Sequence, residues 1–157
     1  MKRYVSALAL AAALAAVALP AAAADEHAVL APGDMKWVPA PPSVPKGAQM
    51  AVLFGDPSKE GLFAMRLKLP KGYSVPPHSH PKPEVVTVIS GTFRIGMGDA
   101  ADAAKAQALP AGGLFAASPG MNHYVAPLDA ETIVQLNSNG PWGVTYANPK
   151  DDPRQTQ

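Results

Sequence analysis

The sequence contains no cysteine, few aromatic residues and no excess of either charge. Without cysteine, the chain has no disulfide, thiolate metal ligand or cysteine nucleophile, so imidazole and carboxylate groups must hold any metal. Thirteen basic residues face 12 acidic ones, and without Lys2 and Arg3 the remainder carries a formal charge of −1. A near-neutral chain with no basic cluster argues against a nucleic-acid partner, because phosphate binding needs an array of Lys and Arg.

Residues 1–24 have the features of a secretory signal peptide. Two basic residues begin the chain, an apolar run follows over residues 5–19, and four alanines come after Pro20. This order predicts cleavage after Ala24. A membrane anchor is disfavoured because the run is short for a bilayer span of about 20 residues. We therefore predict a periplasmic or secreted protein with no membrane segment after cleavage.

The remaining residues divide into an arm, a barrel and a tail. Residues 25–45 are rich in proline, which excludes a helix or a central strand, so we predict an extended arm lying on the domain. Residues 46–148 alternate short apolar segments with turn residues, which predicts one all-β domain. Residues 149–157 form a C-terminal tail. One helical segment is expected, over residues 102–108, with room for a single turn in a surface loop.

Short strands are expected wherever apolar residues alternate or β-branched residues cluster. Phe63 and Met65 share a face with other apolar residues two apart, while Arg66 lies on the opposite face, so this strand has one buried side. The expected strands cover residues 49–54, 62–69, 85–89, 92–97, 114–117, 122–125, 132–137 and 144–146.

The chemistry-bearing residues gather around a His-Ser-His sequence. His78 and His80 are two residues apart, so on a strand their side chains project to the same face. A Pro-Lys-Pro turn then reverses the chain, and Glu84 opens the next strand beside them. Two imidazoles and one carboxylate on neighbouring strands can converge on one ion at about 2.0–2.2 Å. The spacing therefore predicts a metal site.

This stretch resembles the cupin superfamily. The first cupin motif is a Gly, five residues, His-x-His, three or four residues, Glu, six residues and Gly, and it is met by Gly72, His78, His80, Glu84 and Gly91. The second motif adds a His after a Pro-x-Gly turn, which His123 matches. Two positions depart from the second motif, Ser118 in place of the usual Pro and Pro127 in place of the usual Asn, and neither is a ligand.

The resemblance implies an all-β fold, the cupin double-stranded β-helix. It implies that one divalent metal is bound by four inward-facing side chains, His78, His80, Glu84 and His123. It also implies a homodimer, since cupins often pair through sheet edges. The sequence Gly140–Pro141–Trp142–Gly143 and the tail resemble a subgroup of small exported cupins with no assigned reaction. Two solvent-facing histidines are the competing interpretation, which the complete ligand set disfavours.

The metal and the reaction stay open at this point. Three histidines and one carboxylate suit Fe, Mn, Co, Ni, Cu or Zn, and we favour Fe or Mn. Such a set leaves positions for water, O₂ or substrate, as a catalytic metal needs. We favour a dioxygenase-like enzyme acting on a small molecule, with no catalytic side chain beyond the metal centre; isomerisation and decarboxylation suit the same fold. The alternative is a non-catalytic module that binds a small ligand or metal.

Cleavage after Ala24 would also create a terminus with the ligands of a second metal site. The new terminus would read Asp25–Glu26–His27, and a free amine with His in third position chelates Cu(II) or Ni(II). The simpler interpretation is a tail whose third residue happens to be His.

Other polar and apolar candidates surround the predicted metal. Three tyrosines could donate hydrogen bonds to a substrate: Tyr73, Tyr124 and Tyr146. Arg66 and Arg94 could bind a carboxylate substrate. The side-chain amides of Gln135 and Asn137 could support the metal ligands. A largely hydrophobic pocket is expected from Val86, Val88, Phe93 and Met121.

Overall fold

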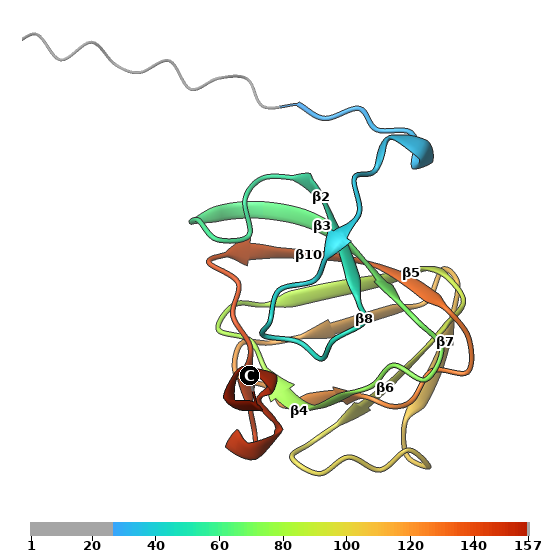
Figure 1. Ribbon diagram of the computed structural model, residues 1–157, viewed down its shortest axis with the longest axis vertical. Coiled ribbons are helices and arrows are strands. Elements are labelled where there is room, and N and C mark those ends of the chain that lie inside the picture. Colours follow the sequence, from blue (N-terminus) through green and yellow to red (C-terminus); the bar gives the residue numbers. More distant parts are fainter. Residues whose placement is uncertain (1–26, 157) are drawn as a thin grey trace, which may run out of the picture.

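The computed structural model describes residues 27–156 (Figure 1). The predicted signal peptide and the pair Asp25–Glu26 lie outside the described residues. The described chain forms eleven strands in two antiparallel sheets, with three short 3-10 helices, η1 (Pro32–Asp34), η2 (Pro149–Asp151) and η3 (Pro153–Thr156). None of the helices in this part of the chain is long and apolar enough to cross a membrane.

The two sheets face each other as a double-stranded β-helix (Figure 1). The larger sheet has the order β1 (Val38–Pro39), β2 (Gln49–Phe54), β3 (Gly61–Leu69), β10 (Thr132–Gly140), β5 (Glu84–Ser90) and β8 (Leu114–Ala117). The smaller sheet has the order β11 (Thr145–Tyr146), β4 (Val75–Ser79), β9 (His123–Val125), β6 (Thr92–Met97) and β7 (Gln107–Pro110). The predicted fold class is therefore confirmed.

Period-two alternation places the core between the sheets. On β3, Phe63 and Met65 are fully buried, while Ala64 between them and Arg66 after them are only partly buried and lie on the outer face. β10 lies beside β3 and also alternates, with Val134 and Leu136 buried. Phe93 and Ile95 of β6 supply the facing apolar side chains from the smaller sheet. Burial of these residues is the main driving force for closing the two sheets on each other.

The proline-rich arm is attached to the barrel rather than free of it. β1 pairs with β2 at the edge of the larger sheet, where the missing proline N–H is tolerated. The following loop is closed at its base by a hydrogen bond from Ala40 N to the Ala48 carbonyl (3.0 Å). The loop is also held by two tyrosine hydroxyls, Tyr146 donating to the Ser43 carbonyl and Tyr73 donating to the Pro45 carbonyl, each at 2.9 Å.

The segment predicted to be helical contains a turn and a strand. The single turn is present, with Lys105 N donating to the Asp102 carbonyl at 3.0 Å. The helical assignment was wrong for Gln107 and Ala108, which belong to β7 and pair with β6. Alanine favours a helix locally, but pairing with the open edge of β6 overrides that preference. The strands β1 and β7 were not among the expected segments, and β4 was expected only from the placement of His78 and His80 on a strand.

Gly96 provides a test of how tightly the smaller sheet packs. A Cβ at this position would overlap the ring and hydroxyl of Tyr124, its partner on β9. We expect Gly96→Ala to lower the free energy of unfolding by about 1–3 kcal/mol, the usual cost of overpacking. Chemical denaturation measures this, with Gly33→Ala as the control, because nothing lies within 4 Å of the added Cβ there. Equal stability of the two variants would contradict the packing.

Candidate metal centre

His78 and His123 are cross-strand partners on β4 and β9 of the smaller sheet. Residues directly opposite each other in an antiparallel pair project to the same face, so both imidazoles point into the barrel. The register between β4 and β9 shifts between Val75 and His78. Pro76 and Pro77 lie at this shift, where prolines cannot donate ladder hydrogen bonds. The two prolines thus accompany the irregularity that sets His78 opposite His123.

His80 and Glu84 complete the cluster, His80 from the end of β4 and Glu84 from the larger sheet. His80 lies just after β4, and its carbonyl accepts a hydrogen bond from Gly120 N at 2.9 Å. Glu84 is the first residue of β5 in the larger sheet. The four side chains therefore come from both sheets and meet between them. All four are buried, with 5% exposure or less.

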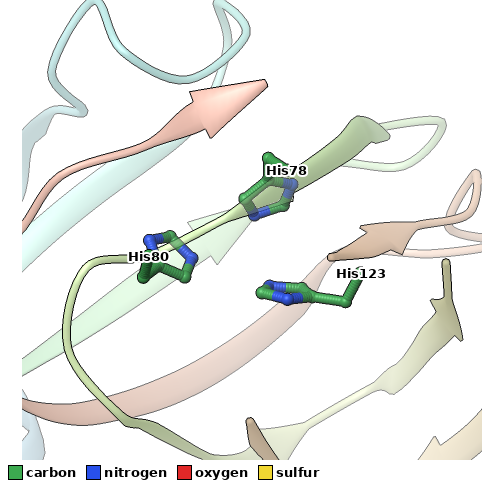
Figure 2. Close-up of side chains that lie close together, drawn as sticks. All are labelled: His78, His80 and His123. Carbon is green, nitrogen blue, oxygen red and sulfur yellow. The ribbon is translucent and has the colours of Figure 1, made fainter. Parts of the chain in front are cut away.

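Glu84 lies at distances from His80 and His123 that suit a shared ion. Figure 2 shows the imidazoles of His78, His80 and His123 converging, and their ligand nitrogens all lie within 4.8 Å of one another. The Glu84 Oε2 atom lies 3.3 Å from His123 Nε2 and 3.5 Å from His80 Nε2. Two donors that share an ion at about 2.1 Å cannot be farther than about 4.2 Å apart. Both carboxylate distances meet that condition.

Backbone carbonyls fix the orientation of each imidazole. The Nδ1 atoms of His78 and His80 lie 2.7 Å from the carbonyls of Pro76 and Gly143, respectively. His123 Nδ1 lies 3.1 Å from the Met121 carbonyl. A carbonyl only accepts, so each Nδ1 carries the hydrogen and a neutral ring keeps its lone pair on Nε2. Three Nε2 lone pairs and one carboxylate form a donor set that fits a divalent transition metal.

The electrostatic environment keeps His78 and His80 in the neutral form that binds metals. Burial, reinforced by the neighbouring His123 and His80, lowers the pKa of His78 to about 3. Burial also lowers the pKa of His80, although Glu84 opposes the shift. Burial alone would raise the pKa of Glu84, but the neighbouring His123, His80 and His78 hold it below its ordinary value. Neutral imidazoles and an ionised carboxylate are the protonation states a metal requires.

A cavity of about 50 Å³ adjoins the cluster. Apart from the four cluster residues, only Tyr73 and Trp142 in its wall carry a polar side-chain atom; the other lining residues are Val, Ala, Leu, Ile and Phe. Val86 and Phe93 line it as the sequence predicted, whereas Val88 is buried elsewhere in the core. The assignment of Met121 to the pocket was wrong, because its side chain is 43% exposed and only its carbonyl supports the site.

Among the wall residues that were not predicted from the sequence are Val44 and Trp142. Val44 of the arm lines the cavity. Its neighbours in sequence, Ser43 and Pro45, are the two residues whose carbonyls accept the tyrosine hydrogen bonds. Trp142 also lines it, and its ring stacks on His80 with centroids 5.1 Å apart and planes 19° apart. The only sequence signal for Trp142 was the unusual Gly-Pro-Trp-Gly stretch, and nothing distinguished Val44 from its proline-rich surroundings.

The three tyrosines proposed as substrate donors are already engaged. Tyr73 and Tyr146 donate to the arm, and Tyr124 donates to the Asp102 carbonyl at 2.8 Å. Their hydroxyls hold loops rather than a ligand. Arg94 likewise donates to the carbonyls of Pro127 and Ala103 outside the cavity.

The amides proposed to support the metal ligands lie on the wrong face. Val134 and Leu136 of β10 point inward, so the residues between and after them, Gln135 and Asn137, point outward. Gln135 accepts a hydrogen bond from Arg66 Nε at 3.2 Å on that outer face. Neither the amides nor Arg66 reach the cavity, and the supporting role is filled by backbone carbonyls instead.

The sequence profile of the ChrR cupin-like domain matches residues 25–142. The chain belongs to this cupin-like family. The match covers all four cluster residues and begins at the residue that follows the predicted cleavage site.

Individual proteins also resemble the chain. Germin-like protein 3-1 of Oryza sativa subsp. japonica is 34% identical over 87 residues, which cover 52% of this chain and 39% of that protein. The polyketide cyclase RemF of Streptomyces resistomycificus has a TM-score of 0.66 at 16% identity, covering 83% of this cupin and 92% of RemF. The complex of Rhodobacter sphaeroides SigE with the anti-sigma ChrR contains a match with a TM-score of 0.50 at 24% identity, covering 69% of this chain and 51% of that chain. At these identities the two structures show the shared fold alone.

The buried histidines predict acid sensitivity of the metal-free cupin. An unfolded imidazole titrates near 6.5 and folded His78 near about 3, so between these values the unfolded state binds the extra proton. The free energy of unfolding should therefore fall as pH falls from about 6.5 towards 3. The lowered pKa of Glu84 acts in the same direction, since its contribution is lost as pH falls through the folded pKa.

Thermal unfolding of chelator-treated protein between about pH 7.5 and 4 measures this slope. His78→Leu removes one of the titrating groups and should give a shallower slope. The same pH dependence of unfolding in the unsubstituted protein and in His78→Leu would contradict the lowered pKa of His78.

Proposed function

We propose that this cupin binds one divalent transition metal through His78, His80, His123 and Glu84 and uses it to transform a small molecule. The observation that carries the proposal is the fixed orientation of the three imidazoles, whose Nδ1 atoms all face carbonyls. That arrangement leaves the Nε2 lone pairs and the Glu84 carboxylate as the donor set. Fe or Mn is favoured for an oxygenase-like reaction, while Zn, Ni, Cu or Co suit the same donors.

The chain's own residues would hold the metal, exclude water and select the substrate. A metal bound by four protein donors supplies Lewis-acid or redox chemistry at its remaining positions. The carbonyls of Pro76, Gly143 and Met121 hold the imidazoles in one tautomer. The apolar wall keeps bulk water out and strengthens electrostatic interactions inside. At about 50 Å³, the cavity suits a small substrate.

Export and dimerisation complete the proposal. The apolar run over residues 5–19, together with a family match that begins at residue 25, supports a periplasmic or secreted protein. A homodimer is supported by an apolar outer face on β5 and β8, where Val85, Ile89 and Leu114 are exposed. Pairing of two copies through this face would remove it from water.

Metal analysis tests the binding site. We expect one Fe, Mn or other transition-metal ion per chain in protein purified from its native compartment, and loss of that ion in a His78→Ala/His123→Ala variant. Glu84→Gln should weaken metal affinity by at least the roughly 10- to 100-fold that loss of an outer partner costs. Elemental analysis and competition with a chelator measure both effects.

The fourth histidine of the chain provides the control. His27 is exposed and distant from the cluster in sequence, so His27→Ala should leave the stoichiometry unchanged. Metal that survives the double substitution and disappears with His27→Ala would move the site to the Asp25–Glu26–His27 terminus.

A non-catalytic module is the second candidate, favoured by the family match to the ChrR cupin-like domain. The metal-loaded protein should consume O₂ or convert a small substrate if it is an enzyme, and the reaction should stop in the His78→Ala/His123→Ala variant. An oxygen electrode and product analysis over a panel of small carboxylates and carbonyl compounds measure this. Saturable ligand binding without turnover would favour the module.

A further inference from the structure

One residue of the cavity wall carries a buried hydrogen-bond donor that has no partner among residues 27–156. Trp142 belongs to the cavity wall and stacks on His80. Its indole Nε1 is buried, and no acceptor reaches it among residues 27–156. Buried indole N–H groups ordinarily find an acceptor, so an unpaired one requires an explanation such as a bound water or ligand.

The rest of the cavity wall offers an incoming oxygen no other free donor. Tyr73 provides the only hydroxyl in the wall, and it already donates to the Pro45 carbonyl. The Nδ1 hydrogens of the three histidines face backbone carbonyls. The other lining residues are Val, Ala, Leu, Ile and Phe. The indole N–H is therefore the one uncommitted neutral donor in the wall.

The loop that carries the indole is fixed to the barrel. Trp142 N donates to the Pro57 carbonyl at 2.7 Å, and the next residue, Gly143, accepts from His80 Nδ1. At the start of the loop, Gly140 packs so closely on the Lys59 carbonyl that no Cβ would fit. Because these contacts hold the ring before any ligand binds, little ordering cost opposes use of its N–H.

We propose that Trp142 determines ligand specificity by donating its indole N–H to an oxygen of a small carboxylate or carbonyl ligand beside the metal. The inference rests on the proposed metal centre, which sets where the ligand binds. The cavity volume and the apolar wall restrict the rest of the ligand to a short hydrocarbon body. A ligand without an oxygen acceptor leaves the N–H unpaired, so the site discriminates against it.

Ligand binding to Co(II)-loaded protein tests the discrimination, because ligands that reach the metal change its visible spectrum. Acetate supplies an oxygen acceptor, whereas ethanethiol reaches the metal through sulfur and offers none. Trp142→Phe keeps an aromatic ring against His80 but removes the N–H. We expect the acetate Kd to rise roughly tenfold in Trp142→Phe and the ethanethiol Kd to change less than about twofold. The proposal would be overturned if the substitution weakened the binding of both ligands equally, or if it weakened the binding of neither.

A second measurement leaves Trp142 intact. The chain has two tryptophans, so Trp37→Phe makes Trp142 the only indole. Trp37 lies on the arm with Lys68 Nζ 4.4 Å from its ring centroid, a contact that Phe preserves. In a ¹⁵N-labelled, Zn-loaded sample, the single indole N–H signal should move downfield as acetate is added and should not do so with ethanethiol.

The two readings separate this inference from the metal centre. An indole signal that acetate leaves unmoved in protein carrying one Zn per chain overturns the role of Trp142 and leaves the metal centre in place. A signal that acetate moves in protein that binds no metal supports the indole site and removes the metal centre. A purely structural role for the ring would change stability without producing the acetate-dependent shift.

Discussion

Four electron-rich groups converge inside an apolar barrel, and much of the local structure serves that convergence. Burying three imidazoles and a carboxylate is costly unless each polar atom has a partner. The Nδ1 atoms of the three histidines have backbone carbonyls as partners. The Nε2 lone pairs and the Glu84 carboxylate have no such partners, and they point at one another. A cation between them would satisfy these groups, which is why the cluster is better explained as a metal centre than as a hydrogen-bonded core.

That requirement accounts for irregularities which a plain β-barrel would avoid. Two consecutive prolines occupy β4 at the register shift before His78, and the Pro76 carbonyl becomes the partner of the same histidine. The turn before β9 ends in Gly120, whose φ of 74° few other residues adopt, and its N–H holds the His80 carbonyl. In both places the strand pairing is irregular, and a histidine of the cluster is held in a fixed position.

The sequence predicts the parts of this arrangement that are local. Residues two apart on a strand share a face, so the buried side of β3 follows from spacing alone. The same spacing predicted that His78 and His80 would lie together, and they do, although β4 ends at Ser79. The position of His123 came from the cupin motif, whereas its physical cause is a cross-strand register with β4. Register across 45 residues of chain depends on how both sheets close, which composition does not encode.

The predictions that were wrong also concern features that depend on how the sheets pack. Gln135 and Asn137 were correctly placed on one face of β10, but which face is inner depends on β3 and β5 packing on either side. Residues 102–108 read as helix because alanine favours it, yet the free edge of β6 recruited Gln107 and Ala108 as a strand. Trp142 and Val44 reach the cavity from loops whose course is set by tertiary hydrogen bonds. The spacing of residues in the sequence does not predict such contacts.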